Sequence, residues 1–77
     1  MKSIKILGTG CDKCEKLAAR TREAAESLGQ DFEIVKISKV SEIMAHGVML
    51  TPALVVDGEV KVVGKVPSVE EIMGMLA

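Results

Sequence analysis

Aromatic side chains are almost missing from this sequence. Among 77 residues there is no tryptophan or tyrosine, and Phe32 is the only phenylalanine. A chain of this size buries only about 60% of the surface that its unfolded form exposes, so its core cannot be large. Because 48% of the residues are nonetheless hydrophobic, we expect one domain over residues 1–77 with an aliphatic core.

An excess of charge of either sign is also missing. The 10 basic and 11 acidic residues are interspersed and give a net charge of -1, which provides no basic surface for nucleic acid or an anionic membrane. Apolar runs are far shorter than the roughly 20 residues of a membrane span. Lys5 and Gly8 interrupt the N-terminal apolar stretch, so it does not resemble a secretory signal. We expect a cytoplasmic protein without nucleic-acid or membrane partners.

Cysteine is scarce, and its spacing is informative. Cys11 and Cys14 are the two cysteines, with two residues between them. A disulfide joining them closes a very short loop, and since stabilisation grows with loop length, holding the fold together is not their main use. In a reducing cytosol such a pair is typical of redox catalysis, redox sensing or metal binding.

Turn residues divide the first half of the chain into segments of alternating type. Residues 3–7 alternate as a strand does and end at Gly8. From 11 to 28, small and apolar residues recur at helical spacing up to Gly29, which predicts a helix. Residues 31–37 are rich in β-branched residues and predict a second strand, parallel to the first because a helix connects the two.

The second half predicts a short helix and a hairpin. Ser38 is expected to cap a helix that ends near Gly47. The Asp-Gly dipeptide at 57–58 is typical of a two-residue turn, here between strands at 53–56 and 59–63.

A final helix follows. Ser68 and Glu71 have the spacing of a capping box before an apolar stripe, although Gly74 weakens the helix. The order strand, helix, strand, helix, hairpin, helix predicts an α/β fold, a four-stranded mixed sheet flanked by helices.

The two cysteines are expected at the first turn of the long helix. Unpaired backbone N–H groups and the helix dipole stabilise a negative sulfur there and lower the pKa of Cys11. Lys13 and Lys16 act in the same direction, whereas Asp12 opposes it. We interpret Cys11 as the nucleophile and Cys14, which begins the apolar stripe one turn away, as the resolving thiol of a thiol-disulfide oxidoreductase.

Three stretches carry a resemblance to a known family. They are Gly-Thr-Gly-Cys-Asp-Lys-Cys at 8–14, Thr-Pro-Ala-Leu-Val-Val-Asp-Gly at 51–58 and Gly-Lys-Val-Pro-Ser at 64–68. Together they resemble the small, glutaredoxin-like redox-active disulfide proteins of the thioredoxin superfamily, known from archaea and bacteria. The resemblance covers essentially the whole chain and implies the minimal thioredoxin fold, βαβαββα.

The resemblance also implies site residues and partners. Pro52 would be a cis-proline facing the cysteine pair, and Thr51 would offer backbone groups to an extended substrate peptide. Gly10, Asp12 and Lys13, beside the cysteines, are further candidates for substrate contact. We expect a monomer without cofactor or bound metal that reduces protein disulfides and receives electrons from a thioredoxin-reductase-like donor.

The sequence departs from the family pattern at several positions. Asp12 stands where many relatives carry proline, and the strand before the cysteines has no carboxylate, so no group is assigned to proton transfer at Cys14. Where glutaredoxins usually show a glycine pair and an acid that hold glutathione, this chain has Gly-Lys-Val at 64–66. Glutathione use is therefore not expected.

Two other functions stay open. Soft thiolates suit Cu(I) and Zn(II), so the cysteine pair could belong to a metal carrier, although a structural zinc site needs four ligands. The chain could also be a non-catalytic adaptor whose disulfide state controls binding.

The remaining candidate residues have structural interpretations. His46 is expected to lie at a helix end, where a cation is favourable. Gly64 is either a close backbone approach near the site, a bulge or a plain loop glycine. Flexible core filling is the expected role of Met44, Met49, Met73 and Met75, with Met49 and Leu50 as additional candidates for lining an apolar substrate groove.

Overall fold

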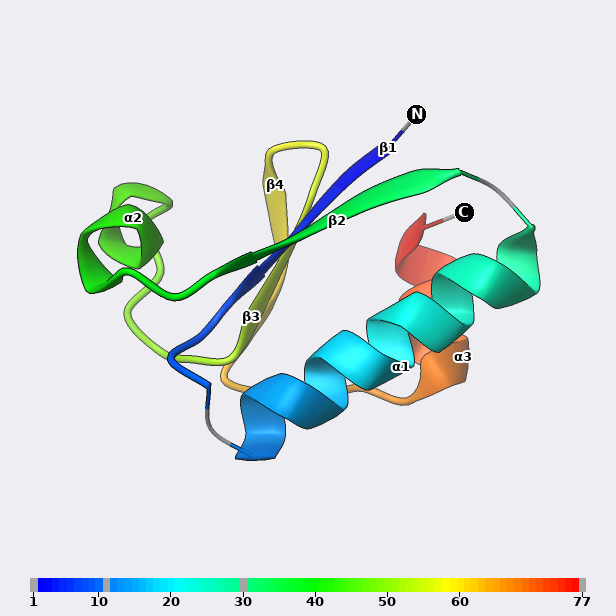
Figure 1. Cartoon of the computed structure of the whole chain (residues 1–77), viewed down its shortest axis with the longest axis horizontal. Helices are drawn as coiled ribbons and strands as arrows, with labels where there is room; N and C mark the ends of the chain where they lie inside the picture. Colours follow the sequence, from blue (N-terminus) through cyan, green and yellow to red (C-terminus); the bar gives the residue numbers. More distant parts are fainter. Residues whose placement is uncertain (1, 11, 30, 77) are drawn as a thin grey trace.

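The computed structural model describes residues 2–10, 12–29 and 31–76 (Figure 1). Its elements follow the predicted order: β1 (Lys2–Leu7), α1 (Asp12–Leu28), β2 (Phe32–Ile37), α2 (Val40–Ala45), β3 (Ala53–Val56), β4 (Glu59–Val63) and α3 (Val69–Leu76). The predicted helix start at Cys11 lies outside the described residues. Among the helices that are described, none has the length and apolar character needed to cross a membrane.

The strands form one mixed sheet in the order β2-β1-β3-β4. β1 is parallel to β2, as a helical crossover requires, and antiparallel to β3, which pairs with β4 as a hairpin. The register places Leu7, the last residue of β1, opposite Ala53, the first residue of β3. The predicted α/β fold with a four-stranded mixed sheet is thus confirmed.

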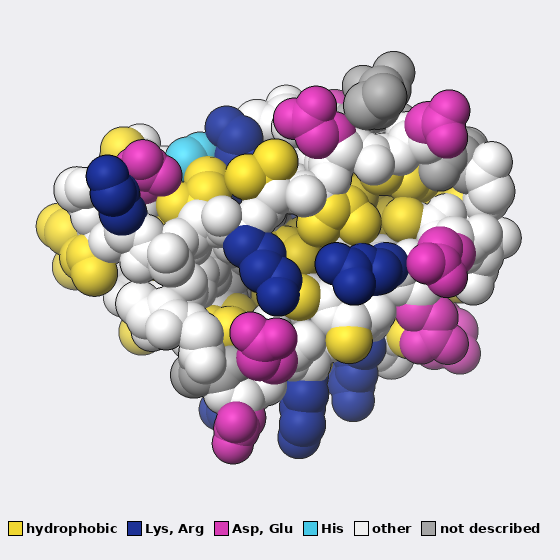
Figure 2. Space-filling model, in the orientation of Figure 1, with side chains coloured by type: hydrophobic (Ala, Val, Ile, Leu, Met, Phe, Trp, Pro, Cys, Tyr) yellow, Lys and Arg dark blue, Asp and Glu magenta, His cyan; other side chains and the backbone are white. Residues whose placement is uncertain are grey.

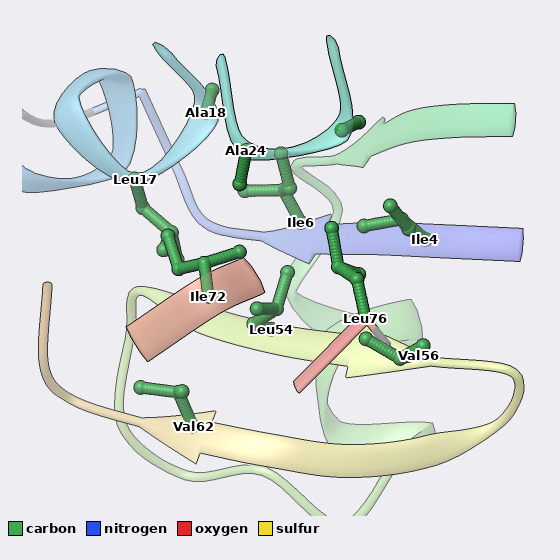
Figure 3. Close-up of a cluster of buried hydrophobic side chains, with 11 residues drawn as sticks. Ile4, Ile6, Leu17, Ala18, Ala24, Leu54, Val56, Val62, Ile72 and Leu76 are labelled. Carbon is green, nitrogen blue, oxygen red and sulfur yellow. The ribbon is translucent and has the colours of Figure 1, made fainter. Parts of the chain in front are cut away.

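Alternation along the strands divides the core into two parts. One part lies between the sheet and the helices α1 and α3, where Leu17, Leu54 and Ile72 meet (Figure 3). The other lies on the opposite face, where α2 contributes Ile43 to a smaller cluster. β1 supplies both, because successive side chains of a strand point to opposite faces: Ile4 and Ile6 to the first, Leu7 to the second. The aliphatic core predicted from the composition is confirmed.

The hairpin turn has the conformation that its dipeptide predicts. Asp57 has a φ of 50° and Gly58 a φ of 82°, the left-handed region in which Asp and Gly are favoured. Asp57 also reaches β1: its backbone N donates to the carbonyl oxygen of Ser3 at 2.8 Å. The backbone N of Ser3 donates in return to Oδ1 of Asp57 at 2.9 Å. The turn is therefore fixed to the N-terminal strand.

Capping was predicted correctly at α3 and wrongly at α2. Before α3, the backbone N of Ser68 donates to Oε1 of Glu71, and the backbone N of Glu71 donates to Oγ of Ser68, both at 3.2 Å. At α2 the N-cap is Lys39 and no side chain caps the helix, so the prediction for Ser38 is wrong. Gly47 does end this helix, with a φ of 77° and its N–H donating to the carbonyl of Met44 at 2.9 Å.

The core role predicted for the methionines holds for two of the four. Met73 and Met75 pack, partly buried, against the α1–α3 cluster. Met44 and Met49 are 60% and 89% exposed, so core filling is wrong for them. The reason is geometric: α2 is six residues long and buries only Ile43, and Met49 lies in the loop beyond it.

Candidate active site

The site predicted around the cysteines lies where β1 ends and α1 begins. The backbone N of Gly8 still donates to the carbonyl of Ile37 at 2.9 Å, which continues the pairing with β2 by one residue. The chain then turns through Gly10, whose φ of 90° suits a residue without a side chain, and enters α1 at Asp12. Cys11, the predicted nucleophile, lies outside the described residues.

Cys14 occupies the first turn of α1 and is 5% exposed, as predicted for a protected thiol. Gly8 makes room for it. A Cβ atom added at Gly8 would overlap the Sγ of Cys14 and would lie 3.0 Å from its Cβ. The sequence indicated only a turn at Gly8; its role as the surface on which the sulfur packs depends on how α1 folds back over the end of β1.

The loop before β3 lies at the same end of the sheet, because Leu7 and Ala53 are partners across β1 and β3. The peptide bond between Thr51 and Pro52 is cis, the isomer that the resemblance implies. Pro52 is fully buried, whereas Thr51 is half-buried. The topology thus brings the stretch that leads into Cys14 and the stretch that precedes β3 to the same end of the sheet, although the two are distant in sequence.

Gly64 holds this loop in place. Its backbone N donates to the carbonyl oxygen of Pro52 at 2.7 Å, and its φ is 71°. A Cβ added at Gly64 would lie 3.5 Å from side-chain atoms of Leu50, which is ordinary contact. Of the roles considered for Gly64, the structure supports a close backbone approach beside the site.

Exposed apolar side chains border the loop. Met49, Leu50 and Val63 are all exposed, and Val63 is the β4 partner of Ala53; we call these three residues the apolar rim. Figure 2 shows that hydrophobic side chains are also exposed over α2, at the left end of the molecule. The other residues predicted to contact substrate, Gly10, Asp12 and Lys13, are exposed too.

A pocket of about 170 Å³ opens beside Cys14. Its lining comes from the end of β1, the first turn of α1 and the end of β2: Ile6, Gly8, Gly10, Cys14, Glu15, Lys36 and Ser38. Across it, Nζ of Lys36 and Oε2 of Glu15 form an ion pair at 3.5 Å. Sequence reasoning did not identify this pair, since the two residues belong to different elements.

A larger pocket of about 410 Å³ lies between β4 and α3 and contains none of the predicted site residues.

Two further side chains have structural roles. Nη1 of Arg20 donates to the carbonyl oxygens of Val66 and Pro67 at 3.4 and 3.2 Å, which fastens α1 to the segment before α3. No sequence pattern indicated this contact. His46 lies at the end of α2 with Nδ1 2.9 Å from the carbonyl oxygen of Glu42, a structural position as predicted.

Within the described ranges, no three His, Cys, Asp or Glu residues are grouped as a metal site.

Comparison with known proteins adds independent information. The sequence profile of the thioredoxin domain family matches residues 2–77. A protein from Methanothermobacter thermautotrophicus named thioredoxin is 44% identical over 77 residues, which is 100% of both chains. A thioredoxin from Methanocaldococcus jannaschii is 48% identical over 69 residues, covering 90% of this chain and 79% of that protein. The family profile and the Methanothermobacter protein match every element from β1 to α3.

Proposed function

The chain belongs to the thioredoxin domain family, and from this premise we propose that it reduces protein disulfides, with Cys11 as the nucleophile and Cys14 as the resolving thiol. The observation that carries the proposal is the burial of Cys14 in the first turn of α1, at the same end of the sheet as Thr51 and Pro52. A thiol that is protected from solvent suits a second, intramolecular step, because competing external disulfides cannot reach it.

The proposed cycle has two exchanges. The Cys11 thiolate attacks one sulfur of a substrate disulfide; a bond forms between Cys11 and that sulfur, and the other substrate sulfur leaves as a thiolate. Cys14 then attacks Cys11, which releases the second substrate sulfur and leaves a Cys11–Cys14 disulfide. The substrate has gained two electrons and the protein has lost them.

Substrate binding is proposed at the loop before β3. An extended peptide can pair with the backbone of Thr51 as an added strand, while its apolar side chains contact the apolar rim. Three exposed residues lie next to the cysteines in the sequence and are available to a peptide that reaches them: Gly10, Asp12 and Lys13.

Electrons are proposed to return from a thioredoxin-reductase-like donor rather than from glutathione. The backbone N–H of Gly64, in the segment where glutaredoxins hold glutathione, already donates to Pro52. Lys65 follows, where glutaredoxins place further glycine and acidic residues.

Reduction of insulin in the presence of dithiothreitol tests the proposal. Wild-type protein is expected to accelerate precipitation of the insulin chains, and Cys11→Ser to abolish the acceleration. Cys14→Ser is expected to accumulate a mixed disulfide that mass spectrometry detects and dithiothreitol reverses. Full activity of Cys11→Ser would refute the assignment of the nucleophile.

The two alternatives have distinct signatures. Stoichiometric copper, zinc or iron in anaerobically purified protein would support a metal carrier. A redox-dependent partner captured by wild-type protein, without turnover of insulin, would support the adaptor.

A further inference from the structure

The larger pocket, between β4 and α3, borders an edge of the sheet. β4 is the last strand in the order β2-β1-β3-β4, so its outer edge has no neighbouring strand in the described sheet. The pocket is lined by three consecutive residues of this strand, 61–63. Because successive side chains of a strand point to opposite faces, a pocket that touches all three reaches the outer edge of β4. Strand edge and pocket together form a groove.

The outer edge of β4 presents backbone groups that an added chain can use. The backbone N of Gly64 donates to the carbonyl oxygen of Pro52 at 2.7 Å. In an antiparallel ladder, hydrogen-bonded and non-hydrogen-bonded pairs alternate. The next pair, Val63 with Ala53, is therefore of the second kind, and the N–H and C=O groups of Val63 point away from β3. An extended peptide alongside can exchange hydrogen bonds with them.

The charged groups of the groove favour an acidic partner. Lys61 and Lys65 both line it, against one carboxylate, that of Glu71. Oε1 of Glu71 already accepts the backbone N–H of Ser68 at 3.2 Å. Nζ of Lys61 lies 3.4 Å from Oε1 of Glu59 in an exposed ion pair, and such pairs contribute little energy, so a partner's carboxylate can compete for the ammonium group.

The rest of the lining is apolar. Figure 3 shows Val62 pointing from β4 towards α3. Val66 and Met75 are half-buried and Pro67 is buried, and all three line the groove. Its volume of about 410 Å³ lies within the range of ligand pockets. An apolar side chain of a bound chain can therefore be accommodated between the two lysines.

We propose that this groove binds an extended acidic peptide segment of a partner protein, which adds a strand to the outer edge of β4. The juxtaposition that carries the inference is a strand edge, an apolar pocket and two ammonium groups in one place. The inference does not rest on the proposed reduction of disulfides. Val63 is the one lining residue that also belongs to the apolar rim.

The spacing of the lysines specifies the peptide. Lys61 and Lys65 are four residues apart, and extended residues rise about 3.3 Å each, so the two positions are separated by at most about 13 Å. Side chains at alternate positions of an added strand lie on the same face. Two acidic residues four positions apart, with an apolar residue midway, match this arrangement.

The same charges disfavour a second copy of this chain as the occupant. Two identical edges pair about a two-fold axis, with the same surface on both sides. Such pairing would bring Lys61 and Lys65 of one groove close to those of the other, and like charges facing each other are unfavourable. An acidic peptide has the opposite effect on the same groups.

The test uses a fluorescently labelled peptide, Thr-Glu-Thr-Leu-Thr-Glu-Thr, in which threonine favours the extended conformation. Fluorescence anisotropy at low ionic strength is expected to show saturable binding that weakens as salt is added. The same peptide with lysine in place of both glutamates is expected not to bind. Cys11→Ser should bind the acidic peptide as wild type does, so failure of the proposed catalytic cycle would leave this binding intact.

Charge reversal in the groove should reverse the preference. We expect Lys61→Glu and Lys65→Glu each to weaken binding of the acidic peptide about fivefold or more. The double variant should bind the lysine peptide in preference, which also shows that it is folded. Lys39→Glu is the matched control, because Lys39 is exposed at the start of α2 and does not line the groove. It should bind as wild type does.

Backbone methylation of the peptide tests strand addition. In an extended chain, alternate N–H groups point to opposite edges. Methylating one alternate set of peptide nitrogens should abolish binding, and methylating the other set should leave it within about twofold. Nuclear magnetic resonance should place the shifted amide signals in β4, α3 and the segment between them.

Several results would overturn the proposal. They are equal binding of the acidic and lysine peptides, no binding of either, unchanged affinity in both lysine variants, or an equal loss in Lys39→Glu. Equal effects of the two methylated sets would exclude strand addition. Shifted signals confined to the loop before β3 would assign the peptide to the substrate site instead. A dimer in sedimentation equilibrium that Lys61→Glu dissociates would identify a second copy as the occupant.

Discussion

The two faces of the sheet are packed to very different degrees. On the face covered by α1 and α3, large aliphatic side chains such as Leu17, Leu54 and Ile72 are completely buried. On the other face, α2 covers one end of the sheet with a single buried residue, Ile43, and the loop that follows exposes Met49 and Leu50. The first face therefore holds the larger buried cluster, whereas the second leaves apolar surface exposed beside the site.

The sharpest way to break this comparison is to make the same truncation in the buried cluster of the first face and in the exposed loop beside the second. Leu54→Ala removes a fully buried side chain and should lower the free energy of unfolding by about 2–5 kcal/mol. Leu50→Ala removes a side chain that is 63% exposed and should change it by less than about 0.5 kcal/mol. Urea unfolding followed by circular dichroism measures both. Equal losses would show that the exposed loop contributes as much to stability as the buried cluster.

Gly8→Ala should have the next largest effect, because Gly8 packs directly against the side chain of Cys14. The added Cβ overlaps the Cys14 sulfur, so the helix start or the thiol must move. We expect a loss of about 1–3 kcal/mol in unfolding free energy, together with slower resolution of a mixed disulfide. Gly74→Ala is the control, since a Cβ there meets no atom within 4 Å. If Gly8→Ala were as stable and active as wild type, the packing of Gly8 on Cys14 would be unimportant.

Ser68→Ala should lower the unfolding free energy by a smaller amount, through α3, one of the two helices on the well-packed face. It removes the hydroxyl that accepts the N–H of Glu71 at the start of α3, which should cost about 1 kcal/mol. Ser38→Ala is the matched control, because no side chain caps α2; its unfolding free energy should match that of wild type. A larger loss at Ser38 than at Ser68 would reverse the assignment of the caps.

Met49→Ser should have the smallest effect on stability and a selective effect on function. The side chain is 89% exposed, so unfolding should shift by no more than about 0.5 kcal/mol. If the apolar rim contacts substrate, kcat/KM for insulin should fall severalfold while the rate with the small probe dithiobis(nitrobenzoate) stays constant. Met44→Ser, on α2 and 60% exposed, serves as the control. A parallel loss for both disulfides would contradict a role in peptide binding.

Local sequence chemistry predicted much of the fold. The Asp-Gly turn, the capping box and the helical spacing after Cys14 each involve residues within a few positions of one another. Such patterns can be recognised in the sequence without knowledge of the tertiary structure. The same holds for the order of the elements. Ser38 shows the limit: a residue suited to capping is not used when the chain enters the helix one residue later, at Lys39.

The site was less accessible to sequence reasoning, because its contacts join distant segments. Gly8 packing on Cys14, Lys36 pairing with Glu15, and Arg20 reaching Val66 depend on how α1 lies across the sheet. The exposure of Met44 and Met49 likewise follows from the shortness of α2, which composition does not reveal. The cysteine spacing could still locate the site, since those two residues are close in sequence.

The central place of β1 has a consequence for biosynthesis. This strand is translated before the segments that pair with its two edges, residues 32–37 and 53–56. A nascent chain that ends between them can complete the βαβ half but must leave one edge of β1 open, a state in which backbone groups can pair with another chain. Translation of the hairpin therefore supplies the strand that covers this open edge of β1.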